Sequence, residues 1–165
     1  MVSWNCCGLG NPMTVHIILG IRKSVFPDVF FLMEMKNTSH NVLQLLHDLD
    51  YSTHHLEPPH SQGAGGLALF WKNSVKVEII SSCQHYIDTK IKAKGQSFFS
   101  TFLYGKPDWT KRVAVWFQLQ ELASSRDSPW ILTSDFNDII HSSEKVEGPP
   151  RPEGSFSDLH VIYMI

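Results

Sequence analysis

Apolar and polar residues along this chain follow two periods, one typical of β-strands and one typical of α-helices. Continuous apolar runs lie at Val29–Met33, Leu67–Trp71 and Trp130–Leu132, and such runs indicate strands that are buried on both faces. Between residues 42 and 49, apolar residues recur at the spacing i, i+3, i+4 and i+7, which predicts an amphipathic helix. The interleaving of the two patterns predicts an α/β fold.

Turn-forming residues divide the chain into further elements. Asn11-Pro12 is a favoured helix start, and a third helix follows Pro107-Asp108. Lys72–Ser74 and Lys94–Gln96 look like hairpin turns, whereas residues 51–66 are expected to be irregular. The predicted strands, taken in order, are Met1–Trp4, Val29–Met33, Leu67–Trp71, Val75–Ile80, Tyr86–Lys92, Phe98–Tyr104 and Trp130–Leu132.

Polar residues of a particular kind come directly after several of these apolar runs. Asn5, Glu34 and Asp135 each follow one, and Tyr104 ends another. Ligands of α/β proteins bind outside the carboxyl ends of strands. Buried carboxylates without partners would be costly, and a hard divalent cation such as Mg²⁺ would remove that cost. The pattern favours a metal site, and the alternative is that these residues cap turns and face water.

The stretch Asp135-Phe136-Asn137 ends the last of these runs. If strand geometry holds to its end, period two places Asp135 and Asn137 on one side and Phe136 in packing on the other. Asp and Asn are also common turn residues, so the alternative is that these two residues only begin a turn. The stretch by itself leaves both interpretations open.

Composition limits the class of protein. The chain has 165 residues, enough for one domain, and its 42% apolar and 18% charged content is typical of a globular protein. The net charge of −2 provides no overall basic field for nucleic acid or membrane. Three cysteines, two of them adjacent, fit neither a disulfide framework nor a zinc motif and favour a reducing compartment. With no membrane-length apolar run and no signal pattern, we expect an intracellular protein.

Six short motifs occur in an order that resembles the endonuclease/exonuclease/phosphatase superfamily. They look closest to the apurinic-type endonuclease domain of plant non-LTR (LINE-like) retrotransposons, over residues 1 to about 160. The motifs are Ser3–Gly10, Phe31–Glu34, Gly65–Trp71, Tyr104-Gly105, Asp135–Asn137 and Ser143–Lys145.

The resemblance implies a fold for residues 1–165. We expect the N-terminal part of a four-layer α/β sandwich, a mixed sheet with helices on its outer face, with the second sheet largely missing because the family's second half is absent. A sheet face left uncovered in this way would favour self-association.

The resemblance also implies roles for five residues. Glu34 matches the principal metal-binding carboxylate and Asn5 the amide beside it, with Mg²⁺ as the cofactor and Mn²⁺ as a substitute. Asp135 matches the residue that activates water or protonates the leaving oxygen, and Asn137 the residue that orients the phosphate or that aspartate. Tyr104 matches a hydrogen-bond donor near the scissile phosphate. Such a site would cleave phosphodiester bonds in DNA.

The chain departs from the family pattern at several positions. Ser134 replaces a glycine, and strain would follow if that glycine has positive φ. Cys7 replaces an arginine, Met35 a threonine and Glu147 a glycine. The family's terminal Ser-Asp-His motif has no counterpart, since residues 157–160 resemble it only superficially, and Asp158 and His160 are expected at the surface.

The implied function therefore has two parts. The parent domain would be a Mg²⁺-dependent DNA endonuclease, nuclear if it acts in retrotransposition, and this chain would be inactive or impaired. The alternatives are a non-catalytic nucleic-acid-binding or protein-binding remnant and, within the superfamily, a phosphoesterase for small molecules. A histidine-rich stretch, residues 54–60, lacks tetrahedral zinc spacing and is interpreted as structural.

Overall fold

The computed structural model describes all residues except 60, 62, 140, 145, 147 and 149–165. Its strands form two four-stranded sheets. The first has the order β1 (Val2–Asn5), β2 (Val29–Met33), β4 (Leu67–Trp71) and β3 (Thr53–Glu57). The second has the order β5 (Lys76–Cys83), β6 (Tyr86–Ala93), β7 (Gln96–Tyr104) and β8 (Trp130–Asp135). The pairs β1–β2 and β7–β8 are parallel, and the other pairs are antiparallel.

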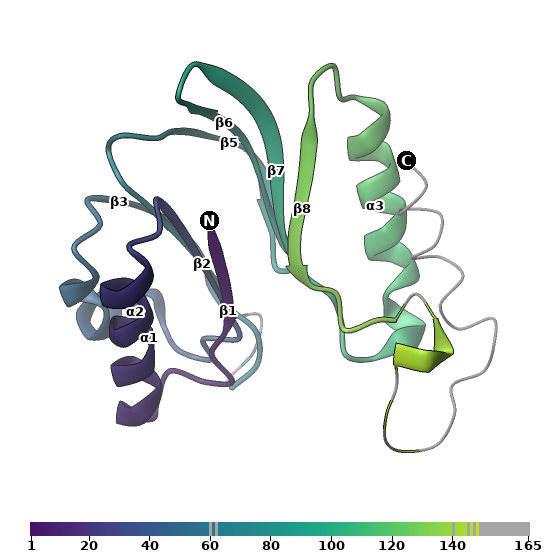
Figure 1. Ribbon diagram of the computed structural model, residues 1–165. Coiled ribbons are helices and arrows are strands. Elements are labelled where there is room, and N and C mark those ends of the chain that lie inside the picture. Colours follow the sequence, from purple (N-terminus) through teal and green to yellow (C-terminus); the bar gives the residue numbers. More distant parts are fainter. Residues whose placement is uncertain (60, 62, 140, 145, 147, 149–165) are drawn as a thin grey trace.

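Helices cover the outer faces of both sheets. In Figure 1, α1 (Pro12–Val25) and α2 (Ser39–Leu45) lie outside the first sheet, and α3 (Val113–Ser124) lies outside the second. Short 3₁₀ turns occur at His47–Leu49 (η1), Trp109–Lys111 (η2) and Ser142–Glu144 (η3). The layers are therefore helix, sheet, sheet and helix, which confirms the predicted α/β sandwich. No helix in the described part of the chain is long and apolar enough to span a membrane.

This layering explains why a strand such as β2 is apolar at every position. Phe30 and Leu32 of β2 pack with the residues of α1 and α2, whereas Phe31 and Met33 pack toward the second sheet. The rings of Phe31 and Phe102 lie 5.3 Å apart between the sheets. Because one face of β2 meets helices and the other meets a sheet, every residue of the strand is buried.

The expectation that the second sheet is largely missing is wrong. Lys72–Ser74 is not a hairpin turn, because β4 pairs with β2 and β3 while β5 pairs with β6. The chain instead crosses at this point into the second sheet. In the described part of the chain, the inner faces of β2 and β4 pack on those of β6 and β7. The sheet face that was expected to lie uncovered is therefore covered there, although Ile131 of β8 is 42% exposed. Apolar runs revealed the strands but not their division between two sheets.

Other local predictions were partly right. Lys94 and Gly95 form a two-residue turn with φ of 50° and 79° between the paired residues Ala93 and Gln96, as expected for a hairpin. The strand β3 was missed, because its sequence lacks clear alternation and its partner β4 is what orders it. The second helix ends at Leu45 and continues only as the 3₁₀ turn η1.

The packing between the sheets predicts how much stability is lost when the aromatic ring of Phe102 is removed. Phe102 is fully buried, and truncation of such a residue leaves a cavity. We expect Phe102→Ala to lower the free energy of unfolding by about 3–5 kcal/mol. Phe117 of α3 is 63% exposed and serves as the control, because Phe117→Ala should change the free energy by about 0.5 kcal/mol or less. Urea denaturation measures both, and equal effects would contradict the assignment of the core.

Candidate active site

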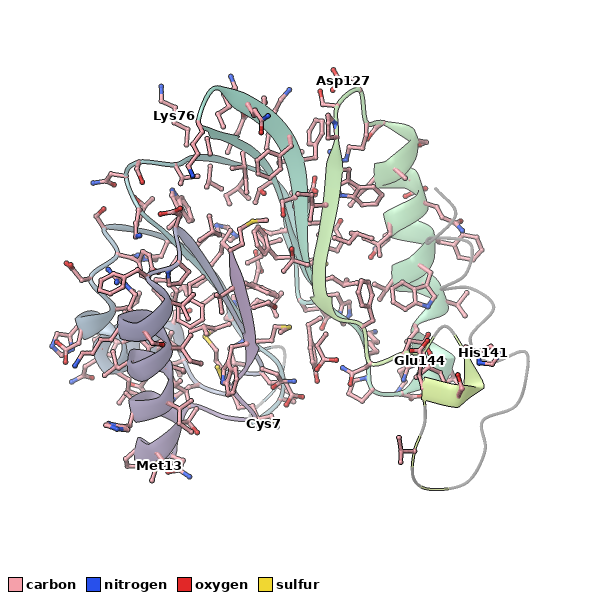
Figure 2. The ribbon with its side chains drawn as sticks, in the orientation of Figure 1. Cys7, Met13, Lys76, Asp127, His141 and Glu144 are labelled. Atoms are coloured by element: carbon pink, nitrogen blue, oxygen red, sulfur yellow. The ribbon has the colours of Figure 1, made fainter. Side chains whose placement is uncertain are left out.

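The carboxyl ends of four strands meet at one end of the sandwich. In the parallel pair β1–β2, Asn5 is opposite Met33, and Glu34 follows directly. In the parallel pair β7–β8, Tyr104 is opposite Asp135. Figure 2 shows this end near Cys7, with Lys76 and Asp127 at the opposite end of the molecule. The two-sheet packing thus places polar residues from both sheets next to each other.

Two hydrogen bonds cross between the sheets at this end. Asn5 Nδ2 donates to Asp135 Oδ2 at 3.0 Å, and the Tyr104 hydroxyl donates to Glu34 Oε1. Together with the strand pairing, these bonds close a ring of four side chains that are distant in sequence. All four are partly or fully buried, so the hydrogen bonds also satisfy groups that would be costly to leave unpaired.

Asn137 joins the ring through the turn that follows β8. Its backbone N–H donates to Asp135 Oδ1 at 3.1 Å, and its side-chain Nδ2 donates to Gly105 O at 2.7 Å. Phe136 points to the opposite side, where its ring lies 6.3 Å from that of Trp116. The stretch is therefore a turn, and it also holds Asp135 and Asn137 on the same side.

The electrostatics of the ring keep the Tyr104 hydroxyl protonated. Burial raises the pKa of Tyr104 most, and its hydrogen bond to Glu34 and the charges of Glu34 and Asp135 raise it further; a hydrogen bond with Asn137 lowers it in part. Tyr104 is therefore a neutral donor that is aimed at the site. Cys6, next to this end, has its pKa raised to about 12, chiefly by burial, so its thiol is not a nucleophile near neutral pH.

Backbone strain is concentrated in the loops of the site. Seven described residues other than glycine have positive φ, and four of them are Cys7, Glu34, Lys36 and Asn137. Such conformations cost about 1–3 kcal/mol each and are often kept where function requires them. Hydrogen bonds between the loops hold these conformations, including Gly8 N–H to Glu34 O at 2.8 Å and Lys36 N–H to Gly65 O at 2.8 Å.

The donor set fits a hard cation with few protein ligands. Glu34 and Asn5 offer carboxylate and amide oxygens, which Mg²⁺ prefers, and the Glu34 side chain is 18% exposed. Asn5 Oδ1 accepts from the Cys7 N–H at 3.0 Å and from the Cys7 thiol at 3.5 Å, so a cation at this oxygen would take the place of the weak thiol donor. Among the described residues, no group of three or more His, Cys, Asp or Glu side chains could enclose a metal. This pattern suits Mg²⁺, which keeps several waters, better than zinc.

A pocket of about 330 Å³ opens beside Glu34 and Tyr104. Its wall includes Lys106, Lys111 and His85. Asp108 also lines the pocket and pairs with Lys111 at 2.9 Å. Lys106, beside the Glu34 carboxylate and the neutral Tyr104 hydroxyl, still gives the pocket a positive charge and a donor, a combination that suits an anionic oxyester bound near a cation. The pocket has room for a phosphate group beside Glu34 and the Tyr104 hydroxyl, whereas Asp135 does not line it and reaches the ring through its hydrogen bond with Asn5.

Sequence reasoning missed the buried ion pair behind these loops. Arg112 and Asp138 have side chains 6% and 2% exposed, and their charged groups lie 2.9 Å apart. Arg112 also donates to the backbone oxygens of Lys106 and Pro107, the latter at 2.7 Å. It therefore ties the loop after β7 to the turn after β8. A single arginine before a helix carries no local signal of this role.

The remaining sequence candidates fall outside the ring. Ser134 lies within β8 opposite Leu103, so its strand backbone does not require glycine. His55 contacts Glu57 of its own strand β3 at 3.1 Å and Ser82 of the second sheet at 3.0 Å, and none of these residues belongs to the ring. Residues 60, 147 and 157–160, which include Glu147, Asp158 and His160, lie outside the described residues.

The close backbone contact at Gly105 predicts that adding a single methyl group there lowers the stability of the protein. A Cβ at this position would lie 2.0 Å from Phe136 O, inside the contact between the two site loops. We expect Gly105→Ala to lower the free energy of unfolding by about 1–3 kcal/mol or more. Gly20→Ala is the control, because a Cβ there meets nothing within 4 Å and alanine favours the helix by up to about 1 kcal/mol. Thermal unfolding distinguishes them, and a neutral Gly105→Ala would contradict the loop contact.

The buried ion pair predicts a strong coupling. Arg112→Met removes the guanidinium group beside the buried Asp138 carboxylate and should cost about 3–5 kcal/mol. The double variant Arg112→Met/Asp138→Leu removes both charges of the pair and should cost only about 1–3 kcal/mol, from the lost bonds to two backbone oxygens. A double-mutant cycle by chemical denaturation measures the coupling. Additive costs would show that the two charges do not depend on each other.

Comparisons with known proteins agree with this architecture. The human Nocturnin catalytic domain with bound sulfate anion aligns with a TM-score of 0.59 at 20% identity, covering 83% of this chain and 63% of that one. Truncated Caenorhabditis elegans TDP2 aligns at 0.61 and 18% identity, covering 89% and 64%. The AP endonuclease LMAP from Leishmania major aligns at 0.64 and 14% identity, covering 89% and 57%. At these identities the likeness shows the fold.

The chain spans less than two thirds of the length of each of these structures. No curated protein sequence matches it. The model of the Endonuclease/Exonuclease/phosphatase family, however, matches residues 2–156, which is nearly the whole chain and includes every residue of the ring. The chain belongs to the endonuclease/exonuclease/phosphatase family.

Proposed function

We propose that this site hydrolyses phosphodiester bonds of DNA with Mg²⁺, as a retrotransposon-type endonuclease. The observation that carries the proposal is the pair of cross-sheet contacts, Asn5 with Asp135 and Glu34 with Tyr104. These contacts bring a carboxylate that can bind a cation and a neutral donor, both at the pocket, together with the oriented carboxylate of Asp135. DNA as the substrate is supported by the name of a structural neighbour, an AP endonuclease. If the chain acts in retrotransposition, it acts in the nucleus.

Each residue of the ring has a role in this proposal. Glu34, helped by Asn5, would hold Mg²⁺ or Mn²⁺, which supplies positive charge for the phosphate and the leaving oxygen. Tyr104, whose hydroxyl stays protonated, would donate its one proton to a phosphate oxygen in place of Glu34 Oε1. Asp135 accepts a proton from the attacking water or donates one to the leaving oxygen. Asn137 holds Asp135 in orientation through its backbone N–H.

We infer low turnover for this chain. The groups that bond the carboxylates of Asp135 and Glu34 are an amide, a backbone N–H, a hydroxyl and an ammonium group. Both oxygens of Glu34 and Oδ2 of Asp135 are already engaged by these groups, so a cation and a water have to displace them before the bond can be cleaved. The alternatives are a remnant that binds nucleic acid or protein without catalysis and a phosphoesterase for small molecules. The non-catalytic remnant requires no metal, so a metal-binding measurement distinguishes it from the nuclease.

A nicking assay on supercoiled plasmid tests the proposal. We expect slow nicking with Mg²⁺ or Mn²⁺ at high protein concentration, none with EDTA, and loss of the activity in Glu34→Gln. Glu121→Gln, an exposed change on α3, is the matched control and should nick like the wild type.

Each alternative predicts a different result. A wild-type chain that binds DNA but neither nicks it nor binds Mn²⁺ would favour the remnant. Cleavage of a small phosphoester without nicking would favour the phosphoesterase. Rapid plasmid turnover would contradict the inference of low activity.

A further inference from the structure

Lys36 forms an ion pair with the carboxylate that we propose as the metal ligand. Lys36 Nζ lies 3.2 Å from Glu34 Oε2, while the Tyr104 hydroxyl occupies Glu34 Oε1. Both carboxylate oxygens are therefore engaged by groups of the protein itself. A cation at Glu34 has to share these oxygens or take the place of the lysine.

The loop backbone directs Lys36 toward Glu34. Both residues have positive φ, 51° and 53°, so the chain turns sharply between them instead of placing them along a strand. The Lys36 N–H donates to Gly65 O at 2.8 Å, which fixes the backbone of the lysine. The side-chain stem passes over Gly8, where an added Cβ would lie 3.7 Å from Lys36 Cδ. The pair thus results from strained loop geometry and not from chance contact of long side chains.

Lys36 also has space into which it can move. In addition to its contact with Glu34, Lys36 lines a second cavity of about 620 Å³, together with Asn37, Thr38 and Ser39. The Lys36 side chain is 33% exposed, so its ammonium group can leave the carboxylate for water without unfolding the loop. A divalent cation at Glu34 would repel the ammonium group and make this movement favourable.

We propose that Lys36 is a resident counter-cation, which neutralises Glu34 before a divalent metal binds and is displaced when it does. The displaced ammonium group stays beside the site and becomes a second positive group for the substrate phosphate. This inference rests on the proposed function, because it takes Glu34 as the metal ligand. The inference adds to that function an exchange at Glu34 between the Lys36 ammonium group and the metal ion, and this exchange lowers the apparent affinity for the metal.

Amine labelling with mass spectrometry tests the exchange directly. An acylating reagent reacts slowly with a lysine in an ion pair, and we expect Mg²⁺ to increase the labelling of Lys36 several-fold over its value in EDTA. Lys72 is the internal control, because it pairs with Asp28 at 3.0 Å and is 29% exposed but lies away from the ring. Its labelling should not change with Mg²⁺.

A variant provides the second measurement. Lys36→Met removes the competing cation and should tighten Mn²⁺ binding, followed by electron paramagnetic resonance, by about two- to fivefold, as expected for a partly exposed pair. Lys72→Met should leave Mn²⁺ binding unchanged. Weaker Mn²⁺ binding in Lys36→Met would overturn the proposal.

Two negative results have different meanings. If Mn²⁺ binding depends on Glu34 but neither Lys36 labelling nor Lys36→Met changes as expected, the exchange is refuted and the proposed metal site stands. If Glu34→Gln binds Mn²⁺ as well as the wild type does, the assignment of Glu34 as the metal ligand is refuted and the exchange with it.

Discussion

The packing of two sheets through their inner faces is the interaction on which the rest of this structure depends. The buried residues of β2 and β4 meet those of β6 and β7 in one apolar layer, with Phe31 against Phe102 at its centre. This layer sets the separation of the sheets and therefore the distance between their strand ends. Asn5 can reach Asp135, and Tyr104 can reach Glu34, only because the layer holds the sheets at that separation.

The polar end of the sandwich is built on this rigid base at some energetic cost. Strained φ values at Glu34 and Asn137 and a buried ion pair between Arg112 and Asp138 each oppose folding or contribute little to it. The apolar layer compensates for them, since burial of large side chains supplies most of the folding free energy. The result is a set of side chains with fixed orientation, which is the property that a catalytic site needs more than stability.

Charge balance gives this site a further constraint. Glu34 is held by one neutral donor and one cation of the protein, and Asp135 by the amide and backbone groups of Asn5 and Asn137. The two carboxylates thus have different surroundings, and different surroundings allow different roles: one that holds a cation and one that exchanges a proton. Our proposals for Mg²⁺ and for Lys36 both develop from this difference.

The sequence by itself determined the local elements and the residues at their ends. The apolar runs identified β2 and β4 because a strand that is buried on both faces shows its burial in every residue. The run of β8 also marked a strand, but the expectation that it is buried on both faces is wrong, because Ile131 is 42% exposed. Polar residues at or near the ends of such runs marked Asn5, Glu34, Tyr104 and Asp135, since a polar group at the end of a buried strand needs a partner or a function.

Only the tertiary structure decided how these parts combine. The division of strands between two sheets, the strand β3 and the Arg112–Asp138 pair depend on partners that are distant along the chain. The ion pair of Lys36 with Glu34 depends on two positive φ values that the loop contacts impose. Periodicity reports which faces of an element are buried but not what buries them, and for that reason these features could not be predicted from the pattern of residues.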